Sequence, residues 1–530
     1  MMLSFLFLTA VFAFVSADID CQGNRDFSPP VGAASPIYFP PTWTPNQPPP
    51  VFGILQSCQF TLKIPQGMYA EVRIHKVASQ SEVTCTYPNL AVENVADMDT
   101  NPYIFTSPQA VLSFKANGAS GSFAFELNWK SYTGYITNKA LLGQNQDPFI
   151  FQATEFLNIF TAAQNSRVSL VAFNLNDNTL LRQSVILDGD NLNALFIGTL
   201  SQVLNSGRQL VSTSNTMTVY TFGMKDQTYP SYVMMGSDYH DTAHFARYTG
   251  HNCKSNIDCS FLLSADIEPA AVVTAHSGRE YIKNLTIDAA TTMSVYKNGV
   301  RKENLVDSFN NINSANRLPS ELSFTVHQYT IESGRAFVQL SRDETDAKWT
   351  VPYDGRTGVM QSYFYGKVAY EQDTDEYLTM PDKSQKMYFE FSNIVCPFDG
   401  NGIIKLYIAI LNDGKETYWD TFSSNHQLPT DPIKVLGDTF KVKFSTNGTL
   451  SSGFKLDFKT TSSGLPPVTG MSSSPTTPST MSTPITAATK NTPITTISGG
   501  TTKSVETTTK VGSMSNYNFL IMGIIVKLFI

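Results

Sequence analysis

The segment FTLKIPQGMYAEVRI, residues 60–74, indicates the fold class. Apolar and polar residues alternate from Phe60 to Ile64, and they alternate again in the second half, where one face would carry Met68, Ala70, Val72 and Ile74. Alternation with a period of two is typical of a β-strand that buries one face. Because Pro65-Gln66-Gly67 favours a turn between the two runs, the segment predicts a β-hairpin.

Strands of the same kind recur along the chain. SFAFELNWK, residues 122–130, would direct inward Phe123, Phe125, Leu127 and Trp129. Amphipathic helices of comparable clarity are missing from the pattern. We therefore expect an all-β protein built from antiparallel sandwiches with one solvated face per sheet.

The length and internal repeats predict several such sandwiches, since a region of about 440 residues is too large for one core. FKANGASGSFAFELNWK at 114–130 resembles FSTNGTLSSGFKLDFK at 444–459; shorter likenesses join CQFTL to CSFLL and TMTVYTFG to TMSVYKNG. We expect modules at 18–133, 134–250, 251–352 and 353–461.

Both ends of the chain have the composition of processing or tethering segments. Residues 1–17 are apolar and end in Val-Ser-Ala, which predicts a signal peptide cleaved before Asp18. Residues 462–510 are rich in Ser, Thr and Pro and predict a disordered, O-glycosylated stalk. Residues 511–530 end in a short hydrophobic run, which predicts a GPI-attachment signal or, alternatively, a short anchor in which Lys527 snorkels.

Six cysteines fit a secreted chain: Cys21, Cys58, Cys85, Cys253, Cys259 and Cys396. Asn284 and Asn447 each stand in an Asn-X-Thr triplet and are candidates for N-glycosylation. The net charge is −7 and basic clusters are absent from the sequence, so we expect no nucleic-acid partner.

Candidate chemical sites are few. His240, His244 and His251 have a spacing that could hold zinc on a helix, but the surrounding sequence favours loop histidines. The acidic segment 373–382 lacks calcium-loop spacing and is interpreted as a solvated loop. GASGS at 118–122 lacks the second glycine of a nucleophile elbow. We expect no catalytic residue, metal or cofactor.

Aromatic residues make up 12% of the chain, which raises the alternative of a stacked aromatic platform for sugar. The alternation around Phe125 and Trp129 places those side chains in a core instead. Trp43 lies in a proline-rich approach, and two placements stay open for it: exposure, or packing across a sheet edge.

These segments carry a resemblance to a known family. Cys21, the stretch YFPPTWTPNQPPP at 38–50, CQFTLKIPQGMYAEVRI and SFAFELNWK together resemble the opening of the nematode CUB-like domain proteins. VSLVAFNLNDNT and CSFLLSADIEP are similar to the later modules of that family. The likeness covers most of residues 18–460 and leaves out the stalk.

The resemblance implies tandem CUB-like, jelly-roll-like β-sandwich modules in a secreted or surface protein without enzymatic activity. It implies disulfides from Cys21 to Cys58 and from Cys253 to Cys259, which leaves Cys85 and Cys396 as one long-range bridge or two free thiols. The acidic set that binds calcium in true CUB domains has no match here. Family members are associated with innate immune and stress responses.

We therefore expect a non-enzymatic extracellular protein that presents a binding surface to an unidentified protein or glycan, tethered to the plasma membrane through its C-terminus. Two alternatives stay open: a secreted glycan-active enzyme, and a structural, mucin-like component of the surface coat.

Overall fold

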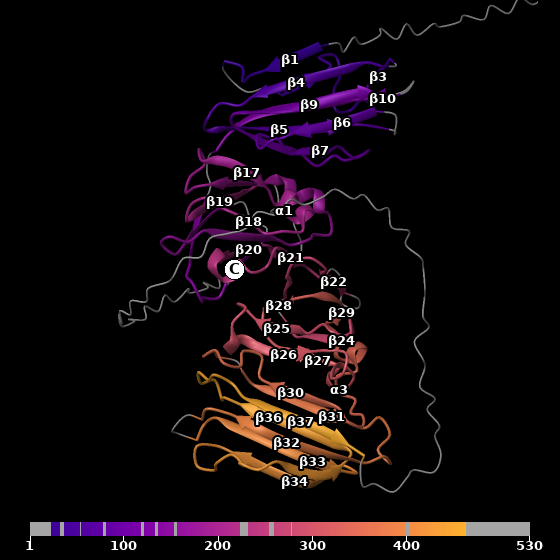
Figure 1. Ribbon diagram of the computed structural model, residues 1–530, viewed down its shortest axis with the longest axis vertical. Coiled ribbons are helices and arrows are strands. Elements are labelled where there is room, and N and C mark those ends of the chain that lie inside the picture. The colour runs from indigo at the N-terminus through magenta and orange to yellow at the C-terminus, as the bar shows by residue number, and fades with distance from the viewer. Residues whose placement is uncertain are drawn as a thin grey trace, which may run out of the picture. The chain divides into compact units, whose positions relative to one another are not determined.

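The computed structural model describes residues 23–31, 36–53, 55–77, 81–117, 121–132, 136–152, 156–222, 232–253, 259–276, 278–370, 372–398 and 402–462. The expected signal peptide at 1–17, Cys21, nearly all of the stalk at 462–510 and the hydrophobic end at 511–530 lie outside these residues. The described strands form four β-sandwiches that belong to one compact unit, coloured from indigo to yellow in Figure 1.

The first sandwich pairs a five-stranded with a four-stranded sheet. The five-stranded sheet runs in the order β1 (Gly23–Phe27), β4 (Ser57–Lys63), β9 (Gln109–Ala116), β6 (Ser81–Thr86) and β7 (Val92–Asn94). The four-stranded sheet runs β2 (Ile37–Phe39), β11 (Ala124–Ser131), β5 (Met68–His75) and β8 (Tyr103–Thr106). A short ribbon joins β3 (Val51–Phe52) to β10 (Gly121–Ser122).

The second sandwich has sheets of the same sizes. One runs β12 (Ile136–Leu142), β14 (Phe156–Ala162), β19 (Thr216–Thr221), β16 (Ser184–Asp188) and β17 (Leu195–Thr199). The other runs β13 (Phe149–Gln152), β20 (Tyr232–Asp238), β15 (Val168–Ala172) and β18 (Leu210–Val211). Its helices are η1 (Asn178–Gln183), α1 (Leu200–Ser206) and α2 (Tyr239–Thr242).

The third sandwich repeats this plan. One sheet runs β21 (Arg247–His251), β23 (Ala270–Ala275), β28 (Val326–Ile331), β25 (Met293–Lys297) and β26 (Leu305–Phe309). The other runs β22 (Cys259–Ala265), β29 (Gly334–Ser341), β24 (Glu280–Ile287) and β27 (Ser320–Leu322). Its helices are η2 (Lys302–Asn304), α3 (Ser314–Arg317) and α4 (Glu344–Ala347).

The fourth sandwich consists of two four-stranded sheets. One runs β30 (Thr357–Gln361), β37 (Lys455–Thr461), β32 (Met387–Val395) and β35 (Ile433–Gly437). The other runs β31 (Thr374–Thr379), β36 (Thr439–Ser445), β33 (Lys405–Asn412) and β34 (Lys415–Phe422). The expectation of an all-β chain of tandem sandwiches is confirmed.

All four sandwiches share one topology. When strands are counted from the start of each sandwich, without the β3–β10 ribbon, the first three have the orders 1-3-8-5-6 and 2-9-4-7. In each of these three, the first strand pairs in parallel with the third, as β1 does with β4. The fourth sandwich has the same order without that first strand. The four modules are therefore variants of one architecture.

The topology separates true repeats from chance likenesses. The long match at 114–130 and 444–459 joins β9 to β11 and β36 to β37, which are equivalent strand pairs. CQFTL lies in β4 and CSFLL in β22, which hold different places in their sheets. TMTVYTFG and TMSVYKNG also fall on non-equivalent strands, β19 and β25. These two shorter likenesses are not structural repeats.

The hairpin expected at residues 60–74 is wrong, although both strands exist. β4 belongs to the five-stranded sheet and β5 to the four-stranded one, so the Pro65-Gln66-Gly67 turn crosses between layers. Phe60 and Leu62 from one sheet and Val72 and Ile74 from the other meet in the same core. Alternation reveals which face is buried, but it does not reveal which strand is the neighbour.

Hydrophobic cores continue from one sandwich into the next. Leu157, Val185 and Phe196 of the second sandwich join the core of the first, and Trp349, which follows α4, joins that of the fourth. Between the second and third, the shared cluster includes Phe173, Met235, Tyr248, Val273 and Val326. Strands at these joints are buried on both faces, as β15, β23 and β28 are throughout.

The expected boundary at residue 250 falls inside β21, which pairs in parallel with β23 of the third sandwich. The sheet pairing therefore puts the start of that module before Arg247. Among the residues that the structure describes, no helix has the length and apolar content needed to cross a membrane.

Candidate functional site

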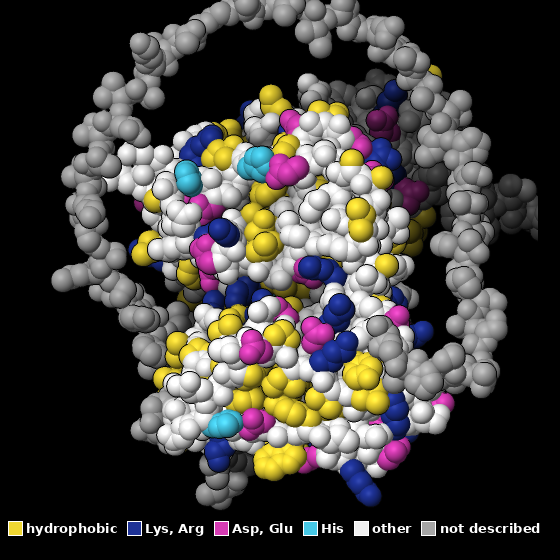
Figure 2. Space-filling view, turned by 60° about the horizontal axis from the view of Figure 1, so that its bottom comes forward, with side chains coloured by type: hydrophobic (Ala, Val, Ile, Leu, Met, Phe, Trp, Pro, Cys, Tyr) yellow, Lys and Arg dark blue, Asp and Glu magenta, His cyan; other side chains and the backbone are white. Residues whose placement is uncertain are grey.

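The outer side of sheet β31–β36–β33–β34 carries an exposed cluster of aromatic and basic residues. We name it the aromatic face and define it by Tyr377, Tyr407 and Trp419 together with Lys405, Lys441 and Lys443. Trp419 is 62% exposed and Tyr377 45% exposed. Figure 2, which turns this end of the molecule toward the viewer, shows yellow, dark blue and magenta side chains side by side on its lower part.

The strand register places these residues. Ala409 of β33 pairs with Trp419 of β34 on one side and with Lys441 of β36 on the other, and Lys441 pairs in turn with Tyr377 of β31. Tyr407 lies two residues before Ala409, so it projects on the same side. The inward positions Leu406, Ile408 and Ile410 fill the core of the sandwich.

Ala409 indicates how the side chains lie on this face. It points outward between Trp419 and Lys441, yet it is fully covered. Its methyl group is too small to reach the core, so neighbouring side chains must close over it and lie along the sheet. These neighbours still leave Trp419 62% exposed.

Polar groups surround the rings. Lys441 Nζ lies 3.3 Å from Asp375 Oδ1, and the Tyr407 hydroxyl donates to Glu416 Oε1. Burial and the Glu416 carboxylate raise the pKa of Tyr407 to about 12, so this phenol keeps its proton. Within the described part of the chain, Lys405 and Lys443 have no acidic side chain within ion-pair distance. The face thus offers donors and acceptors beside aromatic rings.

A smaller apolar patch lies on the third sandwich. Leu262 of β22 pairs with Phe337 of β29, and the two are 57% and 38% exposed. Phe337 also pairs with Thr286, the threonine of the triplet that begins at Asn284. Asn284 is exposed and its Nδ2 donates to Gln339 Oε1 at 3.1 Å. A sugar on Asn284 would leave this patch beside the glycan.

The second glycosylation candidate is also accessible. Asn447 is exposed in a turn, has a positive φ of 49°, and donates from Nδ2 to the carbonyl of Ile403 at 3.0 Å. Both asparagines therefore lie at the surface, as N-glycosylation requires.

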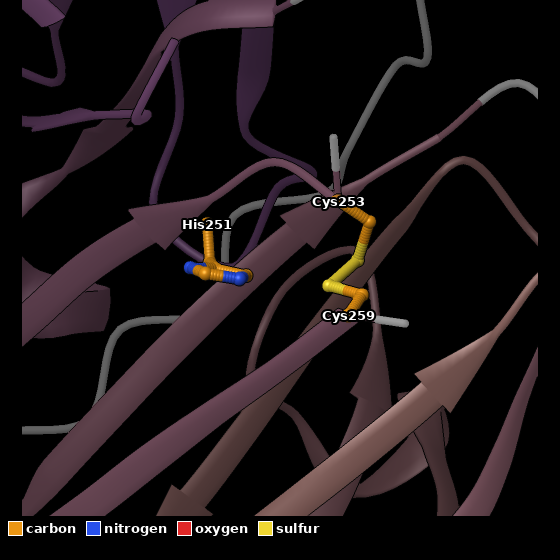
Figure 3. Close-up of side chains that lie close together, drawn as sticks. All are labelled: His251, Cys253 and Cys259. Carbon is orange, nitrogen blue, oxygen red and sulfur yellow. A yellow bond between two sulfur atoms is a disulfide. The ribbon is translucent and has the colours of Figure 1, made fainter. Parts of the chain in front are cut away.

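The structure brings His251 to a disulfide and not to the other two histidines. Figure 3 shows the His251 ring beside Cys253 and Cys259. A ring nitrogen of His251 and the two sulfur atoms lie within 4.8 Å of one another. The two cysteines form the disulfide that the resemblance implied. Because the sulfur ligand of a metal is the thiolate, this cluster is not a metal site while the bond is intact.

His240 and His244 have separate partners. His240 Nδ1 lies 3.2 Å from its neighbour Asp241, and His244 Nε2 lies 2.7 Å from Glu332. Helix α2 ends at Thr242, before it could align the two rings on one face. Asp238, two residues before His240, caps α2 and accepts from the Ala163 amide. These residues do not form a zinc site together.

The acidic segment 373–382 is mostly strand β31, so its interpretation as a loop is wrong. Asp375 and Glu376 point to opposite sides: Asp375 is paired with Lys441, whereas Glu376 is buried and pairs with Arg279. Asp373 accepts from the Thr446 amide, and Asp382 accepts from the Ser384 amide. The carboxylates do not converge on one point.

A cavity of about 410 Å³ separates β26 from the outer side of β30–β37–β32, and acidic residues line it. Asp307 pairs there with Arg317. Glu390 is directly opposite Lys459, and Asp457 accepts from Asn393 Nδ2 at 2.8 Å. Burial raises the pKa of Asp307, which Arg317 opposes. Because each acid has its own partner, the cavity fits a polar joint between sandwiches better than a pair of catalytic acids.

Most of the predicted core aromatics are buried. Phe123 and Phe125 are fully covered and Trp129 is 3% exposed. Trp43 is also 3% exposed: it packs against His75 with ring centroids 4.7 Å apart and donates from Nε1 to the carbonyl of Gln47. Of the two placements left open for Trp43, the structure shows the packed one. In the GASGS segment, Ser122 holds the place of the second glycine; its Oγ accepts from the Val77 amide and donates to the Val77 carbonyl. Ser120, the position of the nucleophile in an elbow, lies outside the described residues.

For Cys85 and Cys396 the sequence left two alternatives, one long-range bridge or two free thiols, and the structure shows free thiols. Cys85 and Cys396 are buried free thiols, in the first and fourth sandwiches, and burial raises the pKa of both. Cys58 is disulfide-bonded; Cys21, its implied partner, lies outside the described residues.

Sequence reasoning missed the aromatic face. Its three rings stand on separate strands, Tyr377, Tyr407 and Trp419, and only the sheet register brings them together. The available signal was KETYWDTF at 415–422, where a tryptophan falls out of phase with the buried Phe422.

Comparisons with known proteins identify a named domain type for the first module alone. Residues 16–133 match a family model described as a CUB-like domain. Residues 141–222 match a domain of unknown function (DUF7592), and residues 240–343 match another (DUF7591). These models end at residue 343, so the relation of the fourth sandwich to the others rests on its strand order. A comparison with curated proteins gives no match.

Solved structures similar to the chain include two CUB1-EGF-CUB2 structures, from rat MASP-1 and human MASP-1/3. The rat protein is 8% identical and covers 41% of this chain and 100% of its own, with a TM-score of 0.16. The human protein is 9% identical, with coverages of 39% and 99% and a TM-score of 0.15. The full extracellular region of zebrafish Gpr126/Adgrg6 is 8% identical, with coverages of 84% and 53% and a TM-score of 0.17. At these TM-scores the structures carry no argument beyond the family match.

The chain thus contains a CUB-like domain at its start. Such domains are typical of extracellular or cell-surface proteins that bind protein or glycan ligands.

Proposed function

We propose that the chain is a non-enzymatic extracellular protein whose four sandwiches present the aromatic face of the fourth as a binding surface. One observation carries this proposal: on the outer face of a sheet, a tryptophan of the edge strand β34 is 62% exposed, and the same face carries two tyrosines and three lysines. Large aromatic side chains with polar neighbours are enriched where proteins bind partners.

The compartment rests on two independent features. Cys253 and Cys259 form a disulfide, and such bonds persist in oxidising surroundings. Asn284 and Asn447 are both exposed, as glycosylation in the secretory pathway requires. Together with the CUB-like domain they favour display outside the cell.

The tether belongs to the proposal as well. A Ser/Thr/Pro stalk at 462–510 would hold the sandwiches away from the membrane, and residues 511–530 would be exchanged for a GPI anchor. Phosphatidylinositol-specific phospholipase C should release the protein from intact cells. Retention on the cells after treatment, together with a mature C-terminus that still contains Lys527, would show a peptide anchor instead.

A part in innate immune or stress responses is the physiological side of the proposal, and the likeness to CUB-like proteins supports it. The protein level at the cell surface should rise when the producing tissue meets bacteria. An unchanged level under bacterial and stress challenge would remove this role and leave the binding function intact.

The binding function itself is tested with the purified full-length protein immobilised through its C-terminal segment. Extracellular glycans and secreted proteins from the same tissue should bind saturably to the wild-type protein. They should bind more weakly to a variant in which Trp419→Ala and Tyr377→Ala are combined. Equal binding by both proteins would show that the functional surface lies elsewhere.

A further inference from the structure

We propose that the aromatic face binds a neutral, β-linked polysaccharide chain, with Trp419 as the main stacking platform. This inference rests on the proposed function, and it adds the chemical class of the ligand. It is carried by three features of the face: its rings, its charges of both signs, and the small residue at the middle of its row.

The rings lie along a line across the sheet. Trp419, Ala409, Lys441 and Tyr377 follow one another on four neighbouring strands. At about 4.8 Å between strands, Trp419 and Tyr377 are roughly 14 Å apart along this row. Such a span suits a chain of several sugar rings, and it exceeds what a single small molecule would occupy.

Charges of both signs lie on the face. Lys405, Lys441 and Lys443 carry positive charge, Asp375 pairs with Lys441, and Glu416 accepts from the Tyr407 hydroxyl. A densely sulfated chain would need clustered cations without nearby acids, and a cationic partner would need the reverse. Sugar hydroxyls both donate and accept hydrogen bonds, so they are satisfied by lysines and carboxylates side by side.

The middle of the row selects the linkage. Ala409 carries only a methyl group and is fully covered, so its own side chain forms no ridge between Trp419 and Lys441. A β-linked chain of glucose-type rings is extended and presents flat faces of C–H groups, which pack on an aromatic ring. A coiled α-linked chain would touch the row at fewer points.

A protein partner fits the face less well. Stable protein interfaces bury about 800 Å² on each side around an apolar centre. Here the centre of the row is a covered alanine, and three lysines stand among the rings. Lysine is depleted at the cores of such interfaces.

Tryptophan fluorescence provides a direct test. The chain has four tryptophans, and Trp43, Trp129 and Trp349 are each at most 3% exposed. Emission changes on ligand addition therefore report mainly on Trp419. The full-length protein is titrated with cellohexaose and chitohexaose as neutral β-linked chains. Maltohexaose serves as the α-linked control and a heparin oligosaccharide as the anionic control.

We expect a saturable blue shift with at least one β-linked chain and none with maltohexaose or heparin. Trp419→Ala should abolish the shift and weaken binding, measured by calorimetry, about tenfold or more. Tyr377→Ala should weaken it less. Phe337→Ala, which removes the exposed aromatic ring of the third sandwich, should leave it unchanged.

The inference is overturned if the wild-type protein binds neither β-linked chain, or if Trp419→Ala binds as tightly as the wild type. It is also overturned if heparin binds best. Phospholipase release and surface display do not depend on this ligand class, so their failure would count against the proposed function separately. Unchanged thermal midpoints verify that the variants fold.

Discussion

Arg182 shows how a single buried charge joins two modules. It lies in η1 of the second sandwich, its side chain is 1% exposed, and it reaches Glu93 at 3.2 Å and Asp99 at 2.5 Å in the first. Its guanidinium also lies 3.9 Å from the ring centre of Tyr103. Burying these charged groups costs free energy. Removing one partner costs more, because the remaining charge stays buried without its counter-charge.

We predict that Arg182→Met lowers the free energy of unfolding by about 3–5 kcal/mol, because Asp99 and Glu93 would lose their cation. Arg208→Met is the matched control: its ion pair with Glu268 is exposed on both sides, so the cost should stay near 0–1 kcal/mol. Urea unfolding followed by circular dichroism measures both values. Similar losses for the two variants would show that Arg182 is not a buried link.

His327 makes stability depend on pH. It is 1% exposed in β28 and donates from Nε2 to the carbonyl of Ser323 at 3.1 Å. Burial lowers the pKa of His327 to about 4, and burial likewise lowers that of His276 to about 4. The unfolded chain takes up protons near pH 6.5, so these residues reduce stability as the pH falls from about 6.5 to 4.

Glu321 changes the pH dependence of stability in the opposite direction to His327. Burial raises the pKa of this carboxyl to about 7, although Arg279 lies 3.1 Å away and opposes the shift. A raised pKa in an acid means that the folded state holds the proton more tightly. Its stabilising contribution is complete below about pH 4.5 and is lost as the pH rises through 7.

Two variants should therefore change the acid sensitivity with opposite sign. Between pH 7 and pH 5, the drop in the urea midpoint should be smaller in His327→Gln, whose amide still donates to Ser323, than in the wild type. It should be larger in Glu321→Gln. Midpoints measured at both pH values for each variant provide the test, and a change of the same sign in both would contradict the assignment.

At the scale of elements, the double burial of joint strands explains what the sequence reveals and what it hides. β4, β5 and β11 have one solvated side, so their alternation was readable. β23 is buried at every position, because its outer side packs on the second sandwich. Such a strand loses its polar residues on alternate positions and resembles any short apolar run.

The candidate site was hidden for a different reason. The outward residues of one strand were readable from alternation, but the aromatic face needs Tyr377, Tyr407 and Trp419 from three strands in a fixed register. That register depends on pairing between strands far apart in the sequence, β31 with β36 and β36 with β33, which short-range patterns do not encode. The core positions Phe123 and Phe125, by contrast, follow from a single strand and were predicted correctly.

Gly250 offers a test of the joint between the second and third sandwiches. It lies in β21 and forms a parallel bridge with Phe173, the residue after β15. A Cβ at this position would lie 2.7 Å from the carbonyl oxygen of Ala172, which is backbone and unable to rotate away. We predict that Gly250→Ala destabilises the protein by about 1–3 kcal/mol.

Gly53→Ala is the control, since its Cβ would meet only the side chain of Gln56 at 3.4 Å. Thermal unfolding of the two variants beside the wild type provides the measurement. If Gly250→Ala keeps the wild-type midpoint, β21 and the backbone at Ala172 and Phe173 are less closely packed than the structure indicates.

At the scale of the whole molecule, the shared cores make the sandwiches energetically dependent on one another. Side chains of the second sandwich complete the core of the first, and Trp349, fully buried beyond α4 of the third, completes that of the fourth. Multi-domain proteins often unfold in separate steps. Here the opening of one sandwich would expose apolar surface on its neighbour, which favours a joint transition.

The two free thiols provide reporters for this coupling, because Cys85 lies in the first sandwich and Cys396 in the fourth and both are buried. A buried thiol with a raised pKa reacts slowly, so alkylation requires opening. We predict that both cysteines become reactive to iodoacetamide over the same range of urea concentration, as mass spectrometry of the separated peptides would show. Cys85→Ser and Cys396→Ser assign each signal. If Cys396 reacts well below the urea concentration at which Cys85 does, the fourth sandwich opens alone, and the shared core around Trp349 contributes little to its stability.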